Sequence, residues 1–395
     1  MNRRDFPFWP LAGYQLFYFA FIGIFSPYFP LYLDAIGWSA ASIAALMVVM
    51  QGARVVAPTL WSLWAGSRFD RMRQVVRWAP LAAAGGFSLF YFSEEVALSL
   101  TAVGVVAFFW SGALPLFEAM TLAHLGREVR RYPLVRLWGS IGFITAVVGI
   151  GIWLEVMPIA TLRHWIIAVL LLLALCGWTL PLPEWEHPAA TGVGRARFAW
   201  WREPQIVWFL LAASLMSVAH GALYTFFSLH LTLLGYSKTM VGFLWALGVV
   251  AEIVLFFFLP RLTARWGVRW PFVATFAIAA GRFLLIGWWA DALLWVVVAQ
   301  TLHAVTFALY HGCAVQLINA WFGARAPALG QALYSSLSFG LGGMVGSALA
   351  GWVWTAAGPG WTFTASAGAA LVGLFAATQS ALRAPRFATQ RDGVE

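Results

Sequence analysis

Five charged side chains interrupt long apolar runs in this 395-residue sequence. They are Arg54, Glu118, Arg136, Glu252 and Arg282. Similar apolar surroundings hold three histidines, His220, His303 and His311. An ionised side chain inside a membrane-spanning helix costs about 2.5–3.5 kcal/mol on insertion scales, so each one needs a partner or a water-filled cavity. Residues of this kind mark substrate and proton pathways, and five of these eight form two groups.

The first group consists of Glu118 and Arg136, on either side of a short basic stretch at 125–131. At a helical rise of ~1.5 Å per residue, both reach a similar depth on adjacent antiparallel helices, so they can pair or share a ligand. The planar fork of arginine bonds both oxygens of a carboxylate. We predict that this group binds substrate, with four further candidates, Arg54, Ser140, His220 and Tyr18.

The second group consists of Glu252, Arg282 and His303, each near the middle of its apolar run. Burial makes a carboxylate easier to protonate, and a nearby guanidinium opposes this effect. Histidine titrates close to neutral pH and can hold or relay a proton. We therefore predict that Glu252 carries a coupling proton while Arg282 and His303 tune it. Glu118 is the alternative carrier.

The composition requires a membrane protein. Hydrophobic residues make up 62% of the chain and charged residues only 10%, against about 25% in a typical soluble domain. This excludes a soluble enzyme, a secreted disulfide scaffold and a disordered chain. The net charge of +9 is explained by arginines in cytoplasmic loops and does not indicate nucleic-acid binding.

Twelve apolar segments are long enough to cross a bilayer core of ~30 Å, which needs ~20 residues per helix. They are 8–33, 39–65, 74–92, 96–124, 134–157, 162–180, 204–234, 238–260, 270–290, 292–322, 327–355 and 359–383. We therefore predict an all-α membrane protein with twelve transmembrane helices. We expect the first segment to be a span and not a signal peptide, since no small-residue cleavage site follows it.

The segments form two halves that resemble each other. The predicted organisation is an N-terminal six-helix bundle at 1–180, a cytoplasmic linker at 181–203 and a C-terminal bundle with a short tail at 204–395. Related sequences, LWGSIGF and LYSSLSF, open spans five and eleven, and short basic turns at 66–73 and 260–269 follow spans two and eight. Parallel six-span repeats are typical of secondary transporters, in which the substrate binds at the midplane between the halves.

The distribution of positive charge predicts the orientation. When alternate loops are assigned to the side of the N-terminus, 19 of the 24 Lys and Arg residues fall on that side. Three more lie within spans, and only Arg163 and Lys238 lie on the other side. Cytoplasmic loops carry the excess of Lys and Arg, so both termini are expected in the cytoplasm of a bacterial-type inner membrane.

A membrane-embedded enzyme or receptor is the alternative of a different class. An enzyme would need a nucleophile with a base, or a metal cluster. We find no HxxEH motif, no Ser-His-Asp order and no Cys/His pairing, and the two cysteines, Cys176 and Cys313, lie in apolar runs. We predict no enzymatic activity, no metal and no cofactor beyond a proton gradient.

Several stretches resemble the major facilitator superfamily, and within it the phenylpropionate-permease branch related to lactose permease. They are YQLFYFAFIGIFSPYFPLYL (14–33), ARVVAPTLW (53–61), VRLWGSIGF (135–143) and TLHAVTFALYHG (301–312). Gly66, Asp70 and Arg71 fit the glycine, acid and base of the superfamily's gating-loop motif, a few residues late for the branch. The resemblance covers the whole chain and implies two pseudo-symmetric six-helix halves.

The lactose-permease group implies roles for the same charged residues. Its sugar-binding Glu on span four and Arg on span five correspond to Glu118 and Arg136. Its coupling Glu, Arg and His on spans eight to ten correspond to Glu252, Arg282 and His303. The departures are apolar or neutral replacements of the group's other polar residues: Leu223, Leu255, Gln300 and Thr306.

A more apolar and more positive cavity suits an aromatic carboxylate better than a sugar. We therefore predict a monomeric, proton-coupled symporter in the lipid bilayer that imports a small organic solute by alternating access. The preferred solute is an aromatic carboxylate such as 3-phenylpropionate. A sugar or nucleoside:proton symporter is the alternative, followed by an exporter of amphipathic compounds.

Overall fold

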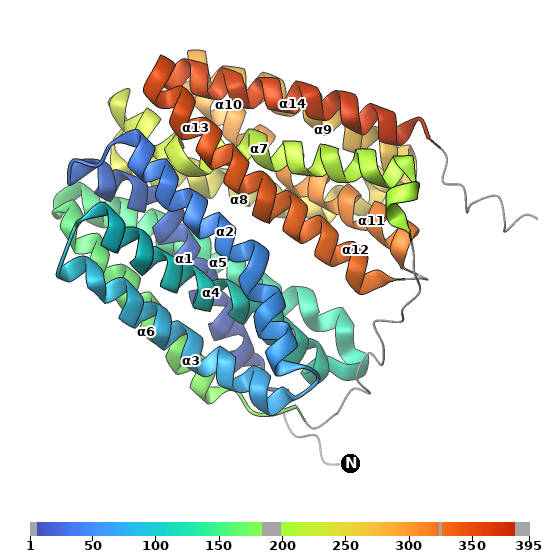
Figure 1. Ribbon diagram of the computed structural model, residues 1–395, viewed down its shortest axis with the longest axis horizontal. Coiled ribbons are helices and arrows are strands. Elements are labelled where there is room, and N and C mark those ends of the chain that lie inside the picture. The colour runs from blue at the N-terminus through green and yellow to red at the C-terminus, as the bar shows by residue number, and fades with distance from the viewer. Residues whose placement is uncertain (1–5, 184–198, 324–325, 384–395) are drawn as a thin grey trace, which may run out of the picture. The chain divides into compact units, whose positions relative to one another are not determined.

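The computed structural model describes residues 6–183, 199–323 and 326–383, and every regular element in these ranges is a helix. Figure 1 shows the helices with their labels. The first six spans are α1 (Phe8–Ala35), α2 (Ala40–Ala65), α3 (Phe69–Phe87) with the short helix η1 (Ser88–Tyr91), α4 (Val96–Leu125), α5 (Tyr132–Val156) and α6 (Leu162–Thr179). Short helices η2 (Gly126–Arg131) and η3 (Ile159–Thr161) precede α5 and α6.

Six further spans follow the short helix η4 (Trp200–Arg202). Four of them are α7 (Pro204–Leu233), α8 (Lys238–Trp266), α9 (Arg269–Trp288) and α14 (Pro359–Ala381). The other two contain a π-helical stretch: α10–η5–α11 (Leu293–Ala304, Val305–Leu309, Tyr310–Phe322) and α12–η6–α13 (Pro327–Tyr334, Ser335–Gly342, Gly343–Ala357). Most of the predicted linker (184–198) and of the predicted tail (384–395) lies outside the described residues.

The prediction of twelve spans is confirmed within the described ranges. Eleven spans are long and apolar enough to cross a membrane. The twelfth, α3, is less apolar because its first nine residues include Asp70, Arg71, Arg73 and Arg77. The prediction of a basic turn at 66–73 is wrong for residues 69–73, which begin α3. The prediction of a basic turn at 260–269 is wrong for residues 260–266, which extend α8 as far as Trp266. The turn is made at Gly267, whose φ of +68° suits glycine.

The chain divides into two compact units. The first is Met1–Thr191 with Thr225–Ala246, and the second is Gly192–Tyr224 with Leu247–Glu395, so α7 and α8 contribute to both. In the first unit, α3 packs on α4 and α6. In the second, α9 packs in the same way on α10 and α14, and Figure 1 shows α9 alongside α14. The matching pairs are a structural repeat of the two halves.

Glycines bring the first and fifth spans of each half close together. A Cβ on Gly23 of α1 would lie 2.7 Å from the carbonyl oxygen of Phe143 in α5. A Cβ on Gly346 of α13 would lie 2.5 Å from the carbonyl oxygen of Val218 in α7. Small residues at such contacts let membrane helices approach backbone to backbone. The two halves therefore repeat this close glycine contact as well as the order of their helices.

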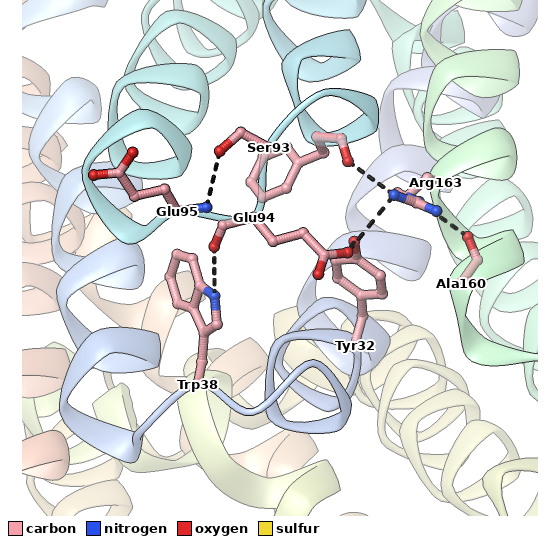
Figure 2. A network of polar contacts seen from close by, with 8 residues as sticks. Tyr32, Trp38, Ser93, Glu94, Glu95, Ala160 and Arg163 are labelled. Atoms are coloured by element: carbon pink, nitrogen blue, oxygen red, sulfur yellow. Dashed lines mark hydrogen bonds and ion pairs between the residues drawn. The ribbon is translucent and has the colours of Figure 1, made fainter.

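One end of the first unit is held by a polar network (Figure 2). The Glu94 carboxylate accepts a hydrogen bond from Tyr32 at 3.2 Å and lies 3.8 Å from the Arg163 guanidinium. The indole of Trp38 donates to the Glu94 backbone carbonyl at 3.1 Å, and Arg163 donates to the carbonyl of Phe90 at 2.8 Å. These bonds tie the end of α1 and the start of α6 to η1 and to the segment that leads into α4.

Candidate functional site

In the first unit, the predicted substrate-binding charges gather around one tyrosine. Tyr18 of α1 lies within electrostatic reach of Arg54 from α2, Glu118 from α4 and Arg136 from α5. Tyr18 itself is buried, whereas the three charged side chains are only partly buried. Four helices therefore bring these residues together, although up to about 120 positions separate them in the sequence. Ser140 lies one helical turn after Arg136 on the same face of α5.

Glu118 and Arg136 do not form an ion pair with each other among the described residues. Glu118 instead accepts a hydrogen bond from the Tyr132 hydroxyl at 3.1 Å. The Arg136 guanidinium lies 4.1 Å from the centre of the Phe19 ring, where the π face attracts a cation. The carboxylate and the guanidinium thus each contact an aromatic residue.

A glycine makes room for this arrangement. A Cβ on Gly139 would lie 2.7 Å from both an Arg136 guanidinium nitrogen and a ring carbon of Phe19. Glycine at this position therefore allows the guanidinium and the ring to lie against the backbone of α5.

Two buried aromatic side chains lie beside the charged side chains of this group. The Tyr18 and Trp110 rings stack with their centres 4.6 Å apart and their planes 13° from parallel. The Arg54 guanidinium lies 5.3 Å from the centre of the Trp110 ring and also donates to Gln51 at 3.1 Å. The Trp110 indole N–H is buried and has no hydrogen-bond partner among the described residues. Cations against aromatic faces can bind an anion that carries an apolar ring.

In the second unit, Glu252 and His303 form a direct contact. Nε2 of His303 lies 2.9 Å from Oε1 of Glu252, and the two side chains are 8% and 13% exposed. Glu252 comes from α8, and His303 from the last turn of α10, just before the π-helical stretch η5. The contact can therefore hold one proton between a carboxylate and an imidazole that are both largely buried.

Arg282 of α9 is fully buried and is held by three hydrogen bonds. They run to the Ala299 carbonyl oxygen at 2.7 Å, the Gln300 side-chain oxygen at 3.1 Å and the Thr306 hydroxyl at 3.2 Å. All three acceptors are neutral and lie on α10 and η5. Arg282 therefore joins α9 to the tenth span, and its charge acts on Glu252 from a fixed position.

His220 of α7 lies with this second group. Its ring centre is 6.0 Å from that of His303 and 5.2 Å from that of Phe283, which follows Arg282. Its Nδ1 is 2.8 Å from the Met216 carbonyl oxygen. The sequence assigned His220 to substrate binding, but the contacts within its unit connect it to the predicted coupling residues.

The gating-loop residues lie at the junction of α2 and α3. Gly66 ends α2 with a φ of +56°, a conformation that favours glycine. Asp70 pairs with Arg68 at 2.6 Å, and this contact raises the pKa of the exposed Arg68 guanidinium. Arg71 donates to the Trp64 carbonyl oxygen at 3.0 Å. Arg71 thus binds the end of α2 while Asp70 pairs with a neighbour.

Sequence reasoning missed several members of both groups. Two acceptors of Arg282 are Gln300 and Thr306. In the sequence these residues drew attention only because they differ from the lactose-permease pattern. Tyr132, the partner of Glu118, gave no signal, since a tyrosine near the end of a membrane helix is common. Trp110 gave none either, because tryptophan occurs 24 times in the chain.

Comparison with known proteins shows the family of the chain. The profile of the MFS_1 like family matches residues 8–365. The chain belongs to this family. It is 30% identical over 342 residues to a protein of Escherichia coli (strain K12) named probable 3-phenylpropionic acid transporter, covering 84% of this chain and 87% of that protein. It is 26% identical over 337 residues to the maltose permease of Geobacillus stearothermophilus, covering 83% and 84%.

Solved structures share the fold at low sequence identity. The nucleoside transporter NupG matches with a TM-score of 0.83 and 16% identity, covering 97% of this chain and all of that one. The POT family transporter PepTSo matches with a TM-score of 0.73 and 13% identity, covering 96% and 98%. The protein is a multi-pass membrane transporter of the major facilitator type, and its relatives are transporters and not enzymes.

Proposed function

We propose that the protein is a proton-coupled symporter that imports an aromatic carboxylate such as 3-phenylpropionate by alternating access. The E. coli relative, named for that acid, supports the solute class. The observation that carries the proposal is the pair of guanidiniums that lie against aromatic rings, Arg136 on Phe19 at 4.1 Å and Arg54 on Trp110 at 5.3 Å.

The balance of charge favours an anion as solute. The predicted binding group of the first unit contains Arg54 and Arg136 but only one carboxylate, Glu118, which gives a net charge of +1. A carboxylate ligand would neutralise this charge, and arginine can bond both of its oxygens. The ring of the ligand would then lie against aromatic faces, an arrangement that adds apolar burial to the ionic contact.

The second unit supplies the proposed proton site. A carboxylate that must load and release a proton needs to be shielded from water and close to a group that can share the proton. Glu252 meets both conditions through its 2.9 Å contact with His303. Coupling through this pair needs no metal and no cofactor other than the proton gradient. Glu118 is the competing carrier, because it too is a carboxylate within a span.

A sugar:proton symporter is the second candidate, favoured by the 26% identity to a maltose permease. It fits the contacts less well. A sugar site needs many hydrogen-bonding side chains, whereas Arg54 and Arg136 each lie against an aromatic ring. We also propose that the carrier acts as a monomer in the inner membrane with both termini in the cytoplasm, as the bias of 19 to 2 basic residues indicates.

Transport by reconstituted protein tests the proposal. Purified protein in liposomes is given an inward proton gradient and labelled 3-phenylpropionate, maltose or uridine. We expect accumulation of the aromatic acid alone, abolished by a protonophore. Arg136→Gln should abolish accumulation, and Arg130→Gln, which changes an exposed arginine in η2, should not. Accumulation of maltose or uridine in place of the acid would reject the anion proposal, and uptake insensitive to the gradient would reject symport.

A further inference from the structure

Two buried imidazole nitrogens in the second unit have no hydrogen-bond partner among the described residues. They are Nε2 of His220 and Nδ1 of His303, and both residues are buried. Buried polar atoms are almost always hydrogen-bonded, so each exception calls for an explanation. The ring centres are 6.0 Å apart. Both unpartnered atoms therefore belong to neighbouring rings.

The tautomer of His220 follows from its own hydrogen bond. Its Nδ1 lies 2.8 Å from the Met216 carbonyl oxygen, which can only accept. The hydrogen of the neutral ring is therefore on Nδ1, and Nε2 presents a lone pair. His220 is fixed as an acceptor.

The state of His303 depends on the proton that it shares with Glu252. When the carboxylate is ionised, Nε2 of His303 donates to Oε1 and Nδ1 presents a lone pair. The lone pairs of His220 and His303 cannot then bond each other, as the structure shows. One added proton on His303 Nδ1 would give both unpartnered atoms a partner at once.

We infer that the coupling proton binds at Nδ1 of His303 and that His220 is its hydrogen-bond acceptor. A new Nδ1–H bond forms, the Nε2–H bond breaks, and its proton passes along the 2.9 Å contact to Oε1 of Glu252. His303 stays neutral throughout and Glu252 becomes a carboxylic acid. A small movement of the rings then joins Nδ1–H to His220 Nε2. This inference rests on the proposed proton coupling and adds His220 to it as a positioning residue.

The charged and titratable groups around the two rings favour a His303 that passes the proton on while it stays neutral. The groups that face the two rings are Glu252 on α8, Arg282 on α9 and Tyr224 on α7. Arg282 is held in place by its three hydrogen bonds and would repel an imidazolium. Moving the proton on to Glu252 avoids that repulsion, because the positive charge ends on the carboxylate that it neutralises.

Infrared titration of the purified, lipid-reconstituted protein tests the inference without any substrate. The carboxylic-acid band that Glu252→Gln removes gives the pH midpoint of proton binding. In His220→Phe the Nδ1–H group of His303 loses its acceptor, and a hydrogen bond of this kind corresponds to a shift of about one pH unit to lower pH. His220→Gln keeps a side-chain acceptor and should restore most of the midpoint.

His311→Phe is the matched control, because His311 lies on the same span as His303 and its Nδ1 lies 2.9 Å from the Tyr334 hydroxyl oxygen. It should leave the midpoint unchanged. An unchanged midpoint in His220→Phe, or an equal shift in His311→Phe, would overturn the inference, as would protonation of Glu252 with no change in the imidazole bands. His220→Leu replaces His220→Phe if the larger ring prevents folding. Failure of 3-phenylpropionate transport with a shifted midpoint would reject only the proposed solute.

Discussion

Replacement of Arg282 by lysine tests how the second unit is held together. Arg282→Lys keeps the positive charge but replaces a planar fork by a single ammonium on a flexible stem. The three acceptors of Arg282 surround the fork at 2.7–3.2 Å, and one ammonium cannot reach all of them. At least one buried acceptor on the tenth span therefore loses its donor.

The expected loss of stability follows from those bonds. A hydrogen bond between membrane helices contributes about 0.6 kcal/mol on average, and a bond to a charged donor in a soluble protein about 1.5–3 kcal/mol. One or two lost bonds therefore lower the free energy of unfolding by about 1–3 kcal/mol. A loss of this size corresponds to a fall of several degrees in melting temperature.

A buried cysteine can be used to follow the unfolding of the second unit. Cys313, in α11 of the second unit, is fully buried and reacts with a thiol dye only when that unit opens. Melting is followed by dye labelling in a Cys176→Ala background, with Arg269→Lys as an exposed control at the start of the same helix. If Arg282→Lys melts at the temperature of the parent, the three bonds do not stabilise the unit and the reasoning is wrong.

Three other changes give distinct results. Glu252→Gln should abolish uphill uptake in liposomes yet leave counterflow exchange intact, whereas loss of uphill uptake in Glu118→Gln alone would make Glu118 the carrier. Arg136→Lys should weaken solute binding by about tenfold or more in equilibrium binding, because the fork is lost while the charge stays. Gly346→Leu should push α13 from α7 and lower the melting temperature, whereas Gly368→Leu, whose position has no close neighbour, should not.

The span pattern could be predicted from the sequence because the bilayer imposes one length and one composition on every helix. The sequence expectation of 39–65 for the second span differs by one residue from α2, where Ser39 caps the start and Gly66 ends the helix. The extension of α8 to Trp266 was missed because Pro260 and nearby arginines read as a turn. Proline is tolerated in membrane helices, and arginines near the ends can extend toward the interface.

The partners of each charge were harder to predict, since they depend on how each helix is rotated about its axis. Spacing placed Glu252 and His303 at similar depths, and the structure brings them into contact. Spacing also placed Glu118 and Arg136 at similar depths, yet in the structure Glu118 bonds Tyr132 and Arg136 lies against Phe19. The π-helical stretch after His303 alters the register within its span and gave no recognisable sequence signal.

The degree of burial separates the two groups by what each could bind. A solute needs side chains that it can reach and whose polar edges are not already used. Arg136 fits this description, being partly buried and in contact with a ring face. A proton needs only one lone pair, and charges interact more strongly where water is excluded. The 8% exposed imidazole of His303 and its carboxylate partner provide such a place. The contrast supports solute recognition in the first unit and proton binding in the second, so mutations in the two units should have separable effects on binding and coupling.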